Sequence, residues 1–167
     1  VANEDTNLYS YDMRKLDIAT CVHKDFVSAV MDIDYSPTGR EFVAGSYDRT
    51  VRMFDYNAGH SKDCYHTKRM QRVFCTRFSM DGSYVFSASD DMNVRCWKAD
   101  ASAQMGTLSA REKRKHAYNA SLKDRFKHMP EIRHIANHHH VPKAIHKQTK
   151  LRRTMQEAET RKAKRRV

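Results

Sequence analysis

Two stretches of this chain repeat each other 43 residues apart, and this repeat constrains the fold more than any other feature of the sequence. Residues 36–55 (SPTGREFVAGSYDRTVRMFD) return as residues 79–98 (SMDGSYVFSASDDMNVRCWK), and the alignment needs no gap. Residues 8–12 match residues 51–55 in the same way, so the end of a third copy opens the chain. A period of this size is typical of the four-stranded blades of a β-propeller.

Turn residues and runs of β-branched and aromatic residues divide each repeat into short strands. Two blades and the end of a third do not close a propeller, which typically needs four to eight blades. We therefore expect an all-β propeller fragment that belongs to a larger protein. The strands expected in the first full repeat are 30–35, 42–46, 50–55 and 62–65, and those in the second are 73–79, 84–89, 93–98 and 104–108.

Polar residues recur at the same places in both repeats. Blades of the WD-repeat type share hydrogen bonds among a His before the inner strand, a Ser or Thr on the second strand, a turn Asp and a Trp on the third. The residues that match this pattern are Ser46, Asp48, Ser89, Asp91 and Trp97, with Phe54 in the place of the first Trp. Phe54 cannot donate the indole hydrogen bond. Because a catalytic Ser-His-Asp set would not occur twice at one period, we expect these residues to be structural and the protein not to be an enzyme.

The net charge of +11 is concentrated in the last part of the chain. Residues 1–108 carry −2 and residues 109–167 carry +13, and the second segment also holds seven of the ten His. This step predicts a domain of propeller blades over 1–108 and a basic helical extension over 109–167. A strongly basic tail indicates a polyanionic partner, with nucleic acid ahead of an anionic membrane, because the tail lacks a broad apolar face.

The tail predicts three helices. Ser109 and Glu112 have the spacing of a capping box at a helix start. Pro130 ends that helix and can open a short second one, and a third is expected over 143–166. The apolar residues that mark one face of each long helix are Tyr118, Leu122, Phe126 and Met129 on the first, and Ile145, Leu151 and Met155 on the third. We expect these stripes to pack on the propeller or on a partner protein.

The basic side chains of the tail exceed what solubility requires, and they would gain free energy by releasing counterions from a phosphate backbone. The RNA-binding candidates are Arg111, Lys113, Arg114, Lys115, Lys123, Arg125, Lys127, Arg133, His138, His139, His140, Lys143 and Lys147. A metal site at these His residues and His134 would lack the Cys or carboxylate ligands that zinc usually has. Phosphate or base contact is the preferred interpretation, and no cofactor is expected.

The four Cys residues contain no CxxC pair, so neither a zinc site nor a disulfide framework is predicted. Cys21 and Cys64 lie one repeat period apart, which indicates equivalent places on successive blades. Free thiols suit a reducing compartment such as the cytosol or nucleus. No apolar run approaches the roughly 18 residues that would span a bilayer.

Five segments of the chain resemble the C-terminal part of the Sof-type WD-repeat proteins. They are VSAVMDIDYSPTG (27–39), GSYDRTVRMF (45–54), YHTKRMQRVF (65–74), SAREK (109–113) and RFKHMPEIRHIANHHHVPKAI (125–145). The resemblance implies a seven-bladed propeller and a nucleolar scaffold of the small-subunit processome. It also implies that this nuclear protein is associated with pre-rRNA, box C/D small nucleolar RNA and other processome proteins, and is needed for early processing of small-subunit pre-rRNA.

The same resemblance implies an alternative of another class, a substrate receptor of cullin-RING ubiquitin ligases. Such receptors dock on the ligase adaptor through a Trp-Asp-x-Arg motif at a blade edge. Residues 11–14 (YDMR) match it with Tyr in place of Trp, so Asp12 and Arg14 are the ligase-adaptor candidates. An ordinary strand end followed by a solvated Arg explains the same residues. No phosphate-binding Gly loop or nucleophile elbow occurs, and we expect no small-molecule substrate.

Overall fold

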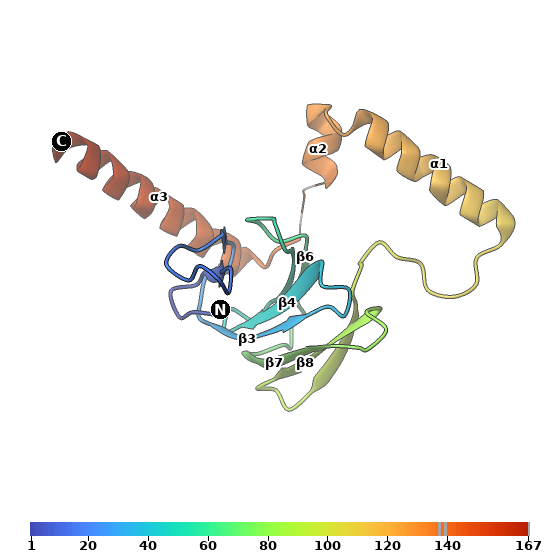
Figure 1. Cartoon of the computed structure of the whole chain (residues 1–167), viewed down its shortest axis with the longest axis horizontal. Helices are drawn as coiled ribbons and strands as arrows, with labels where there is room; N and C mark the ends of the chain where they lie inside the picture. Colours follow the sequence, from blue (N-terminus) through green and yellow to red (C-terminus); the bar gives the residue numbers. More distant parts are fainter. Residues whose placement is uncertain (137, 139, 167) are drawn as a thin grey trace. The chain divides into compact units, whose positions relative to one another are not determined.

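The computed structural model describes residues 1–136, 138 and 140–166, and the chain divides into two compact units (Figure 1). One unit contains residues 1–101 together with the chain from Val141 onward, and the other contains residues 102–140. All the strands and the last helix belong to the first unit. The two preceding helices belong to the second.

Two antiparallel sheets form the centre of the first unit, and each corresponds to one repeat of the sequence (Figure 1). The first contains, in order, β3 (Val30–Tyr35), β4 (Glu41–Ser46), β5 (Val51–Asp55) and β6 (Asp63–Tyr65). The second contains β7 (Val73–Phe78), β8 (Tyr84–Ser89) and β9 (Val94–Lys98). Corresponding inner strands begin 43 residues apart, which confirms the propeller fragment and its period.

The outer strand expected at 104–108 is wrong, because among the described residues the second sheet ends at β9. A shorter sheet, β1 (Leu8–Ser10) paired with β2 (Cys21–His23), is the end of the preceding blade. None of the strands predicted from the sequence covers the residues of β2. The repeat could have predicted β2, since β2 lies about one period of 43 residues before the end of β6.

The two full blades pack face to face through small and branched apolar side chains. Val43, Val51 and Met53 of the first blade form one buried cluster with Met70, Val73 and Val85. Polar groups fix the inner strands beside each other as well. The Asp32 and Asp34 carboxylates of β3 accept the backbone N–H groups of Thr76 at 2.9 Å and Phe78 at 2.7 Å.

The tail forms three helices, as the sequence predicted: α1 (Ala110–Phe126), α2 (Pro130–Ala136) and α3 (Lys143–Arg166). The capping box is present at the start of α1, where the Ser109 hydroxyl accepts the Glu112 backbone N–H at 3.3 Å. The Glu112 carboxylate in return accepts the Ser109 N–H at 3.0 Å. Since local residues determine these ends, the boundaries could be read from sequence.

Candidate nucleic-acid interface

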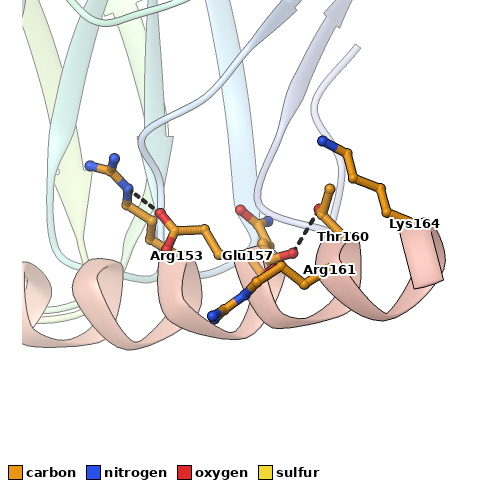
Figure 2. Close-up of a pocket in the computed structure, with 6 residues that line it drawn as sticks. Arg153, Glu157, Thr160, Arg161 and Lys164 are labelled. Carbon is orange, nitrogen blue, oxygen red and sulfur yellow. Dashed lines mark hydrogen bonds and ion pairs between the residues drawn. The ribbon is translucent and has the colours of Figure 1, made fainter.

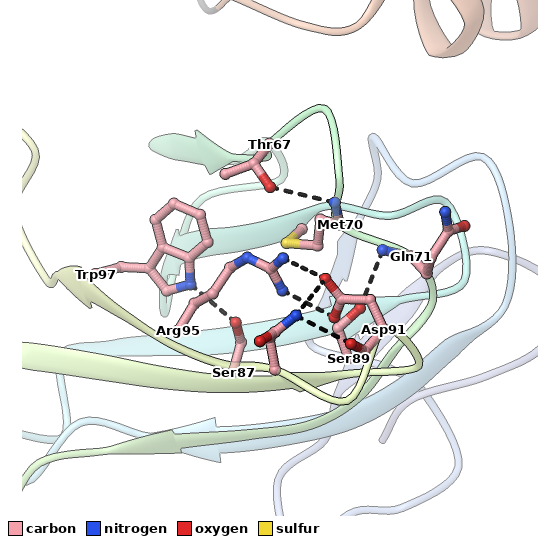
Figure 3. Close-up of polar contacts among 9 residues, drawn as sticks. Thr67, Met70, Gln71, Ser87, Ser89, Asp91, Arg95 and Trp97 are labelled. Carbon is pink, nitrogen blue, oxygen red and sulfur yellow. Dashed lines mark hydrogen bonds and ion pairs between the residues drawn. The ribbon is translucent and has the colours of Figure 1, made fainter.

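Trp97 and Ser89 of the second blade make separate hydrogen bonds and do not share one network (Figure 3). The Trp97 indole N–H donates to the Ser87 hydroxyl at 2.9 Å, whereas the Ser89 hydroxyl accepts the backbone N–H of Gln71 at 3.0 Å. The expected pairing of Trp97 with the Ser89 set is therefore wrong. In the first blade, Phe54 and Ala44 occupy the places of Trp97 and Ser87, so this blade lacks both the donor and the acceptor of the hydrogen bond.

The turn Asp residues of the two repeats, Asp48 and Asp91, make hydrogen bonds that stabilise the turns between neighbouring strands. Asp91 binds the Arg95 guanidinium through both oxygens, and these hydrogen bonds hold the pKa of the Asp91 carboxyl well below its usual range (Figure 3). Asp48 instead accepts the Thr50 backbone N–H at 2.9 Å and is almost fully buried, and burial raises its pKa. Ser46 donates to the Ala29 carbonyl at 2.8 Å. These contacts hold strands and turns together.

Phe54 contributes only the apolar packing of its ring to the first blade, because it has no group that could donate a hydrogen bond as Trp97 does. It is completely buried and stacks on Phe42, with ring centroids 5.3 Å apart and planes 10° apart. The nearby Cys64 thiol is also shielded, and burial raises its pKa to about 11. That thiol is therefore protonated at neutral pH and is not a nucleophile.

The second unit presents its basic side chains to solvent. Arg111, Lys113, Arg114, Lys115, Lys123, Arg125, Lys127, Arg133, His138 and His140 are all exposed, and no residue of α1 or α2 is buried. The apolar stripe of α1 lies open as well, with Tyr118 65% and Phe126 38% exposed. Within the described part of this unit, the expected packing face has no apolar core against it.

The His residues after α2 do not form a metal site in the part of the chain that the structure describes. His134 and His138 stack ring on ring with centroids 6.2 Å apart. No group of three His, Cys, Asp or Glu side chains that could hold a metal occurs among the described residues. The candidate His139 lies outside them.

Helix α3 is anchored to the N-terminal residues of its own unit. Ile145 is buried, and Arg152, seven residues later on the same face, donates to the carbonyls of Asp5 at 3.0 Å and Phe26 at 3.4 Å and to the Thr6 hydroxyl. The expected stripe is only partly correct, because Leu151 and Met155 are 64% and 57% exposed. The sequence pattern did not point to Arg152, since hydrophobic periodicity does not detect a residue that is held by hydrogen bonds. Lys143 and Lys147 stay exposed on α3.

The ligase-adaptor candidates lie in a tight turn after β1. The Asp12 carboxylate accepts the Arg14 backbone N–H at 2.9 Å, and the Asp12 carbonyl accepts the N–H of Lys15 at 2.9 Å. The Arg14 side chain is exposed. This turn and the loop that follows it also expose apolar side chains, with Met13 of the turn 93% and Ile18 of the loop 81% exposed.

One face of the second blade is open where the same face of the first blade is covered. Phe86, Val94 and Cys96 are exposed, Val94 to 72%. One period earlier, Val43, Val51 and Met53 are completely buried against the next blade. Because these residues are one period apart, the repeat would have allowed the equivalence of the two faces to be found from sequence.

No described helix is long and apolar enough to cross a bilayer.

Comparison with known proteins gives two families and several close relatives. Residues 99–167 match the Sof1-like domain, and residues 18–55 and 59–98 match the WD domain, G-beta repeat. The chain is 53% identical over 161 residues to the DDB1- and CUL4-associated factor 13 of Danio rerio, and this alignment covers 96% of the chain and 36% of that relative. It is 52% identical over 151 residues to Protein SOF1 of Saccharomyces cerevisiae, with 90% and 31% covered. The chain thus spans about a third of the length of these relatives.

Proposed function

Because the chain belongs to the Sof-type WD-repeat proteins, we propose that the protein it represents is a non-catalytic scaffold of the small-subunit processome. In this role it supports processing of small-subunit pre-rRNA in the nucleolus. The propeller blades contact other processome proteins, and the basic extension contacts pre-rRNA and box C/D small nucleolar RNA. The proposed boundary between the two parts is residue 108/109.

The observation that carries the proposal is the division of charge. Blades with a net charge of −2 are joined to an extension with +13, and every described RNA-binding candidate is exposed. Positive groups of this kind gain from the phosphate backbone without reading its sequence. The tail aromatics Tyr118 and Phe126 are few, so we expect contacts that position RNA and not base-specific readout.

RNA crosslinking in cells tests this role. The full-length protein should crosslink to pre-rRNA and small nucleolar RNA, and a form that ends at Leu108 should lose most of these crosslinks. Both forms should still recover the processome proteins that bind the blades. Equal crosslinking by the two forms would contradict the role given to the extension.

The turn at Asp12 supports a second candidate function, docking on a cullin-RING ligase adaptor. Several relatives carry the name DDB1- and CUL4-associated factor 13. The turn presents Arg14 beside the exposed Met13, and Leu16 and Ile18 follow in the same loop. Aromatic and aliphatic side chains next to an Arg are common at the centre of protein interfaces.

Recovery of the adaptor from cells separates the two functions. Arg14→Ala should reduce adaptor recovery while leaving processome recovery unchanged. Arg40→Ala is the matched control, because Arg40 is also an exposed Arg in a turn of the blades. The docking proposal fails if neither the wild type nor the control recovers an adaptor, or if both variants recover it equally.

A further inference from the structure

Helix α3 has one docked face, and its position defines which side chains are left for other partners. Ile145 is buried and Arg152 binds the backbone of the N-terminal segment. Since a helix turns 100° per residue, these two residues point in nearly the same direction. Residues that lie about 180° around the helix axis from these two therefore project from the blades into solvent.

That opposite face carries positive charges near both ends of the helix. Its basic members are Lys143, Lys147, Lys150, Arg161 and Arg165, which lie within about 60° of one another around the helix axis, and all are exposed. From the first to the last they extend about 33 Å at 1.5 Å per residue. The first two are already proposed to contact RNA, and the others lie beyond them. We call these five residues the α3 basic row.

Figure 2 shows the part of this face where the row meets its one acidic residue, Glu157. The Glu157 carboxylate accepts a hydrogen bond from Arg153 Nε at 3.0 Å, so a neighbouring cation neutralises it. Arg161 Nε donates to the Glu157 backbone carbonyl at 3.2 Å. Arg161 and Lys164 remain as net positive charge around an open hollow of about 570 Å³.

We propose that the α3 basic row binds the phosphate backbone of RNA, which extends the proposed RNA contact to the C-terminal helix and rests on that proposed function. On this face the residues between Lys150 and Arg161 are Thr154, Glu157 and Ala158. None of them is a large apolar or aromatic residue, whereas the centre of a protein interface is usually rich in these. Leu151 and Met155 lie to one side. Two groups of cations without an apolar centre between them fit a polyanion.

Two lysines on the same helix provide a matched test. Lys150 belongs to the row, and Lys162, also exposed, lies about 120° around the helix from it. The full-length protein is prepared as wild type, Lys150→Gln and Lys162→Gln, and binding to a 20-nucleotide oligouridine and a 20-base-pair RNA duplex is measured across a salt series. Both substitutions remove one charge from an exposed helical position, so neither should disturb folding.

We expect Lys150→Gln to weaken RNA binding about four- to five-fold at 0.15 M salt and to lower the salt slope by about 0.7–0.9, the value of one lost phosphate contact. Lys162→Gln should leave the slope unchanged. Equal effects of the two variants would overturn the α3 basic row while leaving the RNA contact of the extension intact. Displacement of the wild type from RNA by polyglutamate at equal charge concentration would also overturn it, in favour of an acidic protein.

Failure of the proposed function gives a different result. In that case the wild type binds neither RNA probe, and truncation at Leu108 changes no crosslink in cells. If Arg165→Gln, one charge at the far end of the row, behaves as Lys150→Gln does, the contact extends along the helix as proposed.

Discussion

Replacing Gly45 with Ala should loosen the packing between the two blades, because β4 lies close against side chains of the next blade at this residue. A Cβ atom on Gly45 would lie 2.6 Å from Val73 Cγ1 and 2.9 Å from Thr76 Cγ2. Both neighbours are completely buried, so they have little room to move. Overpacking of this kind costs about 1–3 kcal/mol. Ala in a strand recovers about 0.5–1 kcal/mol relative to Gly, which leaves a net loss of about 1–2 kcal/mol.

Thermal unfolding of the purified full-length protein measures this loss. One kcal/mol corresponds to about 2–4 °C in a unit of 150–250 residues, so the Tm should fall by a few degrees. Gly59→Ala is the control, because its Cβ would lie 3.5 Å from the Val22 carbonyl, an ordinary contact. That variant should be as stable as the wild type or slightly more stable.

A double variant identifies the clash as the cause. Val73→Ala removes the closest methyl group, so combining it with Gly45→Ala should cost less than the sum of the two single losses. Additive losses, or a Gly45→Ala protein as stable as the Gly59→Ala control, would refute the reasoning.

Three further predictions concern single polar contacts. Because Arg95 lowers the pKa of Asp91 in the folded protein, Asp91→Asn should be less stable than the wild type near neutral pH. The difference in urea midpoint should shrink below about pH 4, where the Asp91 carboxyl of the unfolded chain takes up a proton while that of the folded protein stays ionised. Arg152→Ala should free α3 and increase tryptic cleavage of its first turns about ten-fold, the effect of roughly 1.4 kcal/mol, whereas the exposed Arg153→Ala should change the rate little. Ser109→Ala should cost α1 about 1 kcal/mol of cap free energy, seen as faster hydrogen exchange in its first turn.

The sequence predicted those parts of the structure that depend on neighbouring residues. The ends of the tail helices follow from Ser109, Pro130 and the residues around Lys143, and each of these acts within one turn. The blade strands follow from a period that appears in the sequence itself. Because both signals are local or repeated, they needed no knowledge of the packing.

Contacts between distant residues were harder to predict. Ser87 and Ser89 lie on the same face of β8, so the choice of Ser87 for the Trp97 indole depends on the register of the strands. Trp97 pairs with Val85, which places Ser87 nearer to the indole than Ser89. The docked face of α3 depends on Arg152 meeting backbone carbonyls more than 120 residues earlier in the chain. Periodicity had favoured Leu151, since it records hydrophobicity and not hydrogen bonding.

The anchoring of α3 makes the segment of residues 102–140 a closed loop, attached to the same unit at both ends. Its 17-residue helix α1 spans about 25 Å. A ligand held by this loop would stay at a high effective concentration near the blades. A single break in the loop would leave both fragments bound, one by the peptide chain and the other by Arg152 and Ile145. Breaking the contacts of Arg152 and Ile145 would release the C-terminal end of this segment and lower the effective concentration, near the blades, of a ligand that the segment binds.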